Sequence, residues 1–355
     1  MKMIKTIQHI YSYIFTCVVI LLITACNDSE SQSQSGYISE YELNKVIVQV
    51  NVVNMATGLK ATFNEFIDDD DERIALTQAM VNEARFFDDD SGYFFVETLD
   101  DATVIAHIYD SWIGTSRIDA QDLNGKYHVQ EMIKTVERIG FGFLSYYFTN
   151  PATDEPADKH SFVTGIDVTE WFIAAGVYND GIANLLDIND ANKTQVKQVT
   201  QPMAEGLSAV LTDIYTDESS QTDFLKVFID YIRFFDDQSG YFFILDSSGT
   251  VIAHGADDSL EGEDYWNLTD SKGDYFVQGL ITTAEENRIV TVAIINIIGR
   301  IPQPERMKKK SPLLSPSQIP TTSSPLAFTY IKFLYEYNEK ESQYRHSSYL
   351  VNSVY

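Results

Sequence analysis

The sequence is poor in cysteine and in basic residues. Cysteine occurs twice in 355 residues, at Cys17 and Cys26, and at no later position. We therefore expect no internal disulfide and no thiolate metal site in the folded part of the chain. Lys and Arg number 25 against 52 Asp and Glu, which gives a formal net charge of −27. A surface this acidic repels phosphate backbones, so we expect no nucleic-acid partner.

The sequence also lacks the motifs of common catalytic and cofactor sites. It contains no phosphate-binding glycine loop, no G-x-S-x-G nucleophile turn and no dinucleotide-binding fingerprint. Its six histidines show no zinc-ligand spacing, and the acidic run at Asp88–Gly92 does not follow the EF-hand order. We therefore predict no catalytic residues, no metal and no cofactor, and we interpret the acidic run as a solvated turn. A hydrolase that uses the acid clusters is the alternative.

Long apolar runs are missing as well. An apolar stretch at Ile14–Ala25 follows a basic start, and its length suits a signal peptide better than a membrane span. It ends in Leu22–Cys26 (LITAC), which resembles a bacterial lipobox. We expect residues 1–25 to be a lipoprotein signal peptide, Cys26 to carry lipid and residues 26–36 to form a polar tether. This predicts a protein anchored to a membrane by lipid on the extracytoplasmic, periplasmic face of the bacterial cell envelope; an ordinary signal peptide that contains a cysteine is the alternative.

One stretch of eleven residues occurs twice. Residues 85–95 read RFFDDDSGYFF, and residues 233–243 read RFFDDQSGYFF, which is one difference at a separation of 148 positions. Downstream, TVIAH at Thr103–His107 recurs at Thr250–His254, and GKYHVQ has a later counterpart, GDYFVQ. A repeat of this length indicates a duplicated unit, so we predict two copies of one domain.

Periodicity predicts the same order of elements in each copy. In the first copy, helix over residues 37–87, with a break near Asn54–Gly58, precedes two strands and a mixed middle segment, and three more strands follow. This order predicts an α+β fold. The predicted strands are Tyr93–Thr98, Thr103–Ile108, Ser145–Thr149, Ser161–Ile166 and Trp171–Tyr178, with Pro151 and Pro156 in a loop; the second copy has helices near 182–215 and 221–235 and strands from Gly240.

These elements and four short sequences, FFDDDSGYFF, TVIAH, NGKYHVQE and WFIAAGVY, resemble the Cache family of extracytoplasmic sensor domains. The resemblance takes the double-module form and covers residues 40–286. It implies two tandem PAS-like modules, each with a long N-terminal helix behind a central antiparallel sheet and a small-molecule pocket on the other face. The first module is assigned to residues 37–180 and the second to residues 181–286.

Composition changes abruptly at Asn287. From there onward nine Lys and Arg stand against four Glu and no Asp, whereas the rest of the chain has 16 basic and 48 acidic residues. Six of the nine prolines lie between Pro302 and Pro325, and the last three strands of the first copy have no evident counterpart. We interpret residues 287–355 as the product of a reading-frame shift that leaves the second module incomplete, with exposed sheet edges. A divergent C-terminal extension is the alternative.

Strand alternation identifies candidate binding residues in the first module. It places Tyr93, Phe95 and Glu97 on one face of a strand and His107 at the end of the next one. Aromatic walls with a few polar tips suit a small carboxylate or amine. Arg85 could instead pair with the neighbouring acids, and His107 could be a core histidine. The residues we predict to bind ligand are Arg85, Tyr93, Phe95 and His107, together with Trp112, Tyr127 and Tyr146, which fall where the resemblance implies a pocket.

The sequence thus predicts a lipid-anchored sensor rather than an enzyme. We expect the protein to bind a small organic acid or amino acid in its first module and to act through a receptor or kinase partner. A structural or adhesive surface lipoprotein with a vestigial pocket is the alternative.

Overall fold

The computed structural model describes residues 36–179, 181, 184–235, 237–270, 272–287 and 330–334. All of these residues fall within one compact unit, Gly36–Tyr355. We call Tyr37–Asn179 module 1 and Leu185–Leu334 module 2. The predicted signal peptide and Cys26 lie outside the described residues, as does most of the segment that we interpret as frameshifted.

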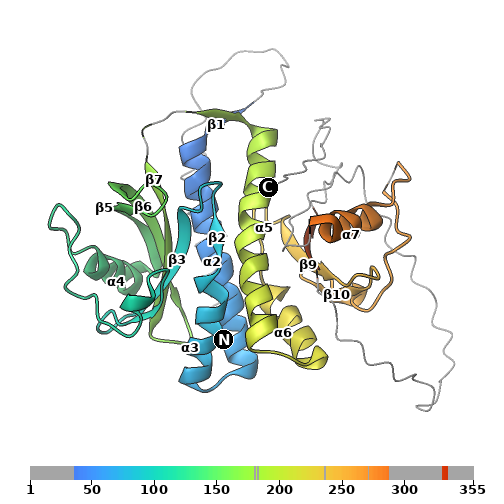
Figure 1. Cartoon of the computed structure of the whole chain (residues 1–355), viewed down its shortest axis with the longest axis horizontal. Helices are drawn as coiled ribbons and strands as arrows, with labels where there is room; N and C mark the ends of the chain where they lie inside the picture. Colours follow the sequence, from blue (N-terminus) through green and yellow to red (C-terminus); the bar gives the residue numbers. More distant parts are fainter. Residues whose placement is uncertain are drawn as a thin grey trace, which may run out of the picture. The chain divides into compact units, whose positions relative to one another are not determined.

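Module 1 begins with two helices and continues into an antiparallel sheet (Figure 1). The sheet order is β2-β3-β7-β6-β5, and β4 also pairs with β3. The elements are β1 (Tyr37–Ser39), α2 (Glu40–Phe66), α3 (Asp70–Asn82), β2 (Arg85–Phe86), β3 (Gly92–Thr98), β4 (Val104–Ala106), the 3-10 helix η1 (Asp110–Trp112), α4 (His128–Ile139), β5 (Phe141–Asn150), β6 (Glu155–Ile166) and β7 (Trp171–Asn179).

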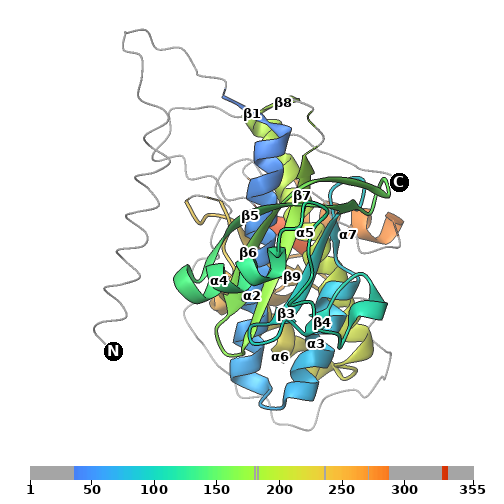
Figure 2. The ribbon, with the colours of Figure 1, turned by 90° about the vertical axis from the view of Figure 1, so that its left-hand side faces the viewer.

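The sheet of module 1 separates two hydrophobic cores. Helix α2 packs against β6 and β7 on one face, and α4 packs against β5 and β6 on the other (Figure 2). The helix-side core extends into module 2, whereas the α4-side core belongs to module 1 alone. The predicted α+β class, with a long helix behind an antiparallel sheet in two tandem copies, is confirmed.

Module 2 repeats the helices and the first strands. Helices α2 and α5 lie side by side, and α5 also packs against α3 (Figure 1). The sheet of module 2 has the order β10-β9-β11. Its elements are β8 (Leu185–Asp187), α5 (Ile188–Asp213), α6 (Glu218–Asp230), β9 (Tyr241–Leu245), β10 (Val251–His254), η2 (Asp258–Leu260), α7 (Phe276–Asn287) and β11 (Tyr330–Leu334). Among the residues described, none of the helices is both long enough and apolar enough to cross a bilayer.

The predicted helix break near Asn54–Gly58 is wrong. Helix α2 runs through both positions, and the first helical segment ends at Phe66, before the Asp69 cap of α3. Asn54 is buried, and Gly58 faces the ring of Phe228, which a Cβ at Gly58 would approach to 2.4 Å. The glycine that suggested a helix break is therefore a contact residue between helices α2 and α6.

Two other expectations need correction. Pro156 lies in β6, paired with Thr149 of β5, and not in a loop. Strand β7 pairs with β6 only as far as Asp158, so Pro156 has a single neighbouring strand, which is the edge position where a sheet tolerates proline. Module 2 also has a counterpart for one of the strands predicted to be missing, since β11 pairs with β9 in antiparallel register, as β7 does with β3.

A polar clamp joins the modules beside β2. The buried amide of Gln198 on α5 accepts the Phe87 N–H at 2.5 Å and donates to Asp88 at 3.0 Å. Glu205, also on α5, accepts the Arg85 N–H at 2.9 Å. Helix α5 thus supplies the acceptors that the outer edge of β2 needs.

We expect Gln198→Ala to lower the free energy of unfolding by about 1–3 kcal/mol, because it leaves the buried Phe87 N–H without an acceptor. Urea unfolding of the full chain measures the change. Lys197→Ala is the control; it removes only an exposed ion pair to Asp88 and should cost less than about 1 kcal/mol. Equal effects of the two variants would contradict this account.

Candidate functional site

The candidate site lies on the face of the module 1 sheet that α4 covers. Tyr93 and Phe95 of β3 point to this face and are 1% and 3% exposed. Tyr146 lies on the same face, on the edge strand β5, and its hydroxyl hydrogen-bonds that of Ser161 at 2.9 Å. The alternation of β3 therefore places its residues as predicted.

The segment after β4 closes over these rings. The ring of His107 lies 5.5 Å from that of Tyr93, 5.9 Å from that of Phe95 and 4.6 Å from that of Trp112, centroid to centroid. The His107 Nδ1 accepts the Tyr109 N–H at 3.0 Å, so the proton of the neutral ring is on Nε2. His254 makes the equivalent bond to Asp257 in module 2, and this contact therefore belongs to the fold.

Lys159 of β6 ends at the centre of this face. Its side chain is 0% exposed, and its Nζ has no hydrogen-bond partner. The Nζ lies 3.9 Å from the centroid of the Tyr93 ring and 4.9 Å from that of Tyr178. The ring centroids of Phe148 and Phe95 lie 5.5 and 5.8 Å from the same Nζ. An amine among ring faces with no acceptor is an incomplete site for an anion.

A glycine makes room for this amine. Gly176 of β7 lies opposite Ser161 of β6. This is the next pair on the same face of the sheet after Lys159 and Tyr178. A Cβ at Gly176 would lie 2.6 Å from the Lys159 Cε and 2.4 Å from the Ser161 Oγ. The closing strand WFIAAGVY thus contains glycine where the lysine must pass.

A second polar group borders the rings. Glu97, 0% exposed, faces Arg117 at 3.3 Å, and Arg117 in turn lies 3.4 Å from His128 Nε2. The guanidinium lies over the Trp112 ring at 4.2 Å. Glu97 Oε2 and His128 Nδ1 have no partner, as is true of Lys159 Nζ. Three buried polar atoms without partners on one face indicate a place for a polar ligand.

Burial controls the charge of these groups. It lowers the pKa of His107 to about 2 and that of His128 to about 4, so both rings are neutral at pH 7. It raises the pKa of Glu97 to about 7, against the opposing effect of Arg117. It also brings the pKa of Lys159 well below the usual lysine value, and Arg117 adds to that decrease.

Two of the predicted residues lie at or beyond the margin. Arg85 pairs with Tyr93 across β2 and β3, so it shares the face, but its guanidinium donates to the Ala84 carbonyl at 2.9 Å and not to the neighbouring acids. Burial lowers its pKa. Tyr127 precedes α4, is 43% exposed and stands apart from the rings. The structure therefore brings together Tyr93, Phe95, His107, Trp112 and Tyr146, with Arg85 beside them.

Sequence reasoning missed three polar residues of the site, namely Lys159, Arg117 and His128. Lys159 and Arg117 lie outside the repeated stretches, and His128 lies in one of them, where the second copy has phenylalanine. Arg117 and His128 also come from a middle segment to which no helix was assigned. A signal existed for Lys159, because it alternates with Ser161 and Val163 along β6. The described residues include no group of three or more His, Cys, Asp or Glu arranged to hold a metal ion.

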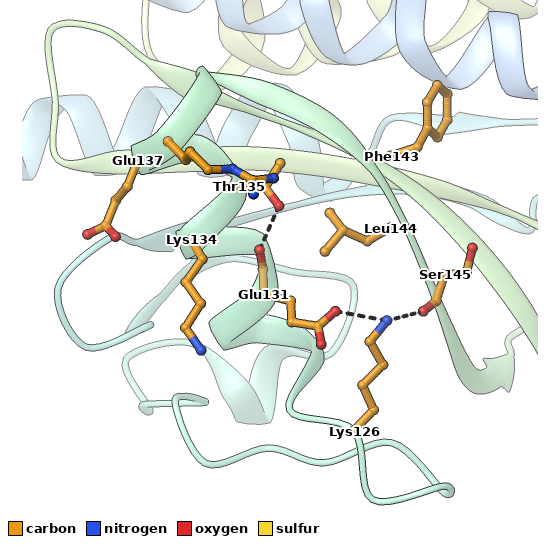
Figure 3. Close-up of a pocket in the computed structure, with 9 residues that line it drawn as sticks. Lys126, Glu131, Lys134, Thr135, Glu137, Phe143, Leu144 and Ser145 are labelled. Atoms are coloured by element: carbon orange, nitrogen blue, oxygen red, sulfur yellow. Dashed lines mark hydrogen bonds and ion pairs between the residues drawn. The ribbon is translucent and has the colours of Figure 1, made fainter.

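An open groove lies elsewhere on module 1, between α4 and the start of β5 (Figure 3). Its volume is about 820 Å³, and charged residues of both signs line it. Lys126 crosses it to reach Glu131 at 2.9 Å and the Ser145 carbonyl at 2.7 Å. These polar groups already satisfy one another in contact with solvent, so we do not assign the groove as the ligand site.

Comparisons with known proteins agree with this architecture. The family model described as single Cache domain 2 matches twice, at residues 44–188 and 185–310. A sensor histidine kinase, MctS of Rhizobium johnstonii, is 29% identical over 133 residues, which are 38% of this chain and 28% of the kinase. The match thus spans less than a third of the kinase's length.

Solved structures similar to this chain include those of two chemotaxis proteins. One is a periplasmic sensor domain of a chemotaxis protein, with 24% identity, a TM-score of 0.35, and coverage of 39% of this chain and 94% of that one. Another, a methyl-accepting chemotaxis protein from Vibrio parahaemolyticus, has 21% identity, a TM-score of 0.35, and coverage of 39% and 91%.

We expect Lys159→Met to stabilise the ligand-free protein by about 1–3 kcal/mol, because it removes a buried amine that lacks an acceptor. The unfolded lysine titrates near 10.5 and the folded one lower, so folding releases a proton at pH values between the two. The advantage of the variant should therefore shrink as the pH approaches 10.5. Urea unfolding at several pH values measures this, with the surface variant Lys126→Met as the control.

Proposed function

The chain belongs to the single Cache domain 2 family, and from this we propose that module 1 binds a small organic acid whose carboxylate pairs with Lys159. Cache domains are extracytoplasmic sensor modules rather than catalytic ones. The observation that carries the proposal is the Lys159 Nζ, fully buried among aromatic rings and without an acceptor. A carboxylate supplies the missing charge and acceptor together.

The strength of this pairing is sufficient for a sensor. A charge-assisted hydrogen bond contributes about 1.5–3 kcal/mol. Micromolar affinity corresponds to about −8 kcal/mol in total, so two such bonds with ring contacts account for it. The Nε2–H of His107 is a suitable second donor, because its ring packs against Tyr93, over which the amine lies.

The other end of the site favours a ligand with a second polar group. Glu97 has one oxygen without a partner and a pKa of about 7, so it can accept from a hydroxyl or donate to a carbonyl. An amino acid could pair its ammonium with Glu97, and this is the class against which organic acids should be tested.

The rings of the site contact one another, so a ligand must displace some of them. Trp112 and Phe148 lie nearest the exterior and are half-buried, with ring centroids 6.3 Å apart. We assign entry to movement of the segment that carries Trp112, since η1 contains no buried residue. The same close packing favours the second candidate, a structural lipoprotein whose pocket is vestigial.

Module 2 does not share three of the polar residues of the site. The positions equivalent to Glu97, Arg117 and His128 hold Leu245, Tyr265 and Phe276, which belong to an apolar core. Tyr241, Phe243 and His254 keep the aromatic part of the arrangement. We therefore place a single carboxylate site in each chain, in module 1.

The cellular setting remains part of the proposal. We propose that Cys26 carries lipid and holds the sensor on the outer side of a membrane. The protein would pass the occupied state of module 1 to a receptor or kinase partner, and the similarity of part of this chain to a sensor histidine kinase supports this.

A ligand screen tests the proposal. We expect one or more two- to four-carbon carboxylates at about 100 times the dissociation constant to raise the free energy of unfolding of the full chain by about 2.7 kcal/mol. Lys159→Met should abolish this response and leave the protein folded, and Arg85→Ala and His107→Ala should weaken it. Lys126→Met, at the surface groove, should respond as the wild type does. No response to any acid or amino acid would favour the vestigial pocket.

Binding should also take up protons. Because the pKa of Lys159 is lowered in the free protein, a carboxylate raises it again on binding, and affinity falls as the pH rises above the lowered value. Calorimetry in buffers of different ionisation enthalpy should show proton uptake and a stoichiometry of one. The variant Glu97→Gln separates the proton uptake of Lys159 from that of Glu97, because proton uptake by Lys159 should persist when Glu97 can no longer titrate.

A further inference from the structure

The two modules meet through contacts that repeat when the copies are exchanged. Strands β1 and β8 pair antiparallel, with Ile38 opposite Leu186 and Tyr37 opposite Asp187. Equivalent positions of the copies are 148 apart, so Ile38 faces its own counterpart. The flanking bonds exchange in the same way: Glu40 N donates to Asn184 O at 2.9 Å, and Ile188 N donates to Gly36 O at 3.0 Å.

The contacts between helices also recur when the two modules are exchanged. Gly58 of α2 faces Phe228 of α6, where a Cβ would lie 2.4 Å from the ring. The equivalent Gly206 of α5 faces Met80 of α3, where a Cβ would lie 2.3 Å from the carbonyl oxygen. Met80 and Phe228 are themselves equivalent positions. A surface in which residue i meets j′ while j meets i′ is isologous, as in a twofold-symmetric dimer.

We propose that the face formed by β1, α2 and α3, here called the helix face, is built to recognise a second copy of the module. In this chain the occupant is module 2, which fills the face from within and leaves it closed to another chain. The β1–β8 strand pair and the two glycine crossings both support this occupant, because each contact recurs with the modules exchanged. The proposal does not depend on what module 1 binds.

Polar contacts differ between the two halves. Gln198 and Glu205 of α5 clamp β2 of module 1, but their equivalents on α2 are Val50 and Thr57. Val50 has no polar group, and the Thr57 hydroxyl donates within its own helix to the Val53 carbonyl. The helix face of module 1 is thus fitted to module 2 beyond what two identical copies could provide. This difference favours an internal partner over exchange with a second chain.

Engineered cysteines test the occupant. In the full chain with Cys17 and Cys26 replaced by serine, Ile38→Cys with Leu186→Cys should form an intramolecular disulfide, because opposed residues of an antiparallel pair lie within disulfide reach. Tyr37→Cys with Leu185→Cys is the matched control; these positions are not opposed and should not link. Ile38→Cys alone should give no linked dimer. Linked dimers from that single variant, or failure of the opposed pair to link, would overturn the proposal.

The glycine crossings provide a second measurement. Gly58→Ala should lower the melting temperature of the full chain, and Phe228→Ala should remove that penalty in the double variant, because the clash is with a side chain. Gly206→Ala should lower it too, but Met80→Ala should not compensate, since the clash there is with a backbone carbonyl. Neutral effects of both glycine substitutions would contradict the close crossing.

Discussion

A buried amine without an acceptor is the constraint that shapes module 1. Lys159 reaches the centre of the face only because Gly176 leaves space on the next strand. The rings of Tyr93 and Tyr178 provide the favourable contact that the amine has, through their electron-rich faces. Ring contacts stabilise a cation less than water does, so the site keeps an unmet demand for negative charge.

Module 2 shows the same framework without the polar group that borders the rings in module 1. Leucine, tyrosine and phenylalanine occupy the positions of Glu97, Arg117 and His128 and pack as core. The shared histidine bond to the following loop persists in both modules, which separates the part of the repeated sequence that builds the fold from the part that carries charge. Duplication has thus left one polar site and one apolar replica.

The repeated stretch made the fold predictable, because duplicated sequences with alternating strands leave few architectures. The polar site was harder to predict. Arg117 and His128 come from the segment between strands, where the hydrophobic periodicity carried no signal. The break expected at Gly58 failed for a related reason. A glycine required for a close crossing and a glycine that ends a helix look alike until the neighbouring helix is known.

The clamp on β2 has a mechanical consequence. Strand β2 lies beside Tyr93, and the backbone N–H groups of Arg85 in β2 and of Phe87 directly after it are bonded to Glu205 and Gln198. Any shift of the Tyr93 ring that carries β2 with it must either break two buried bonds or move α5 as well. A shift of β2 would therefore also move a helix that contributes no residue to the proposed ligand site.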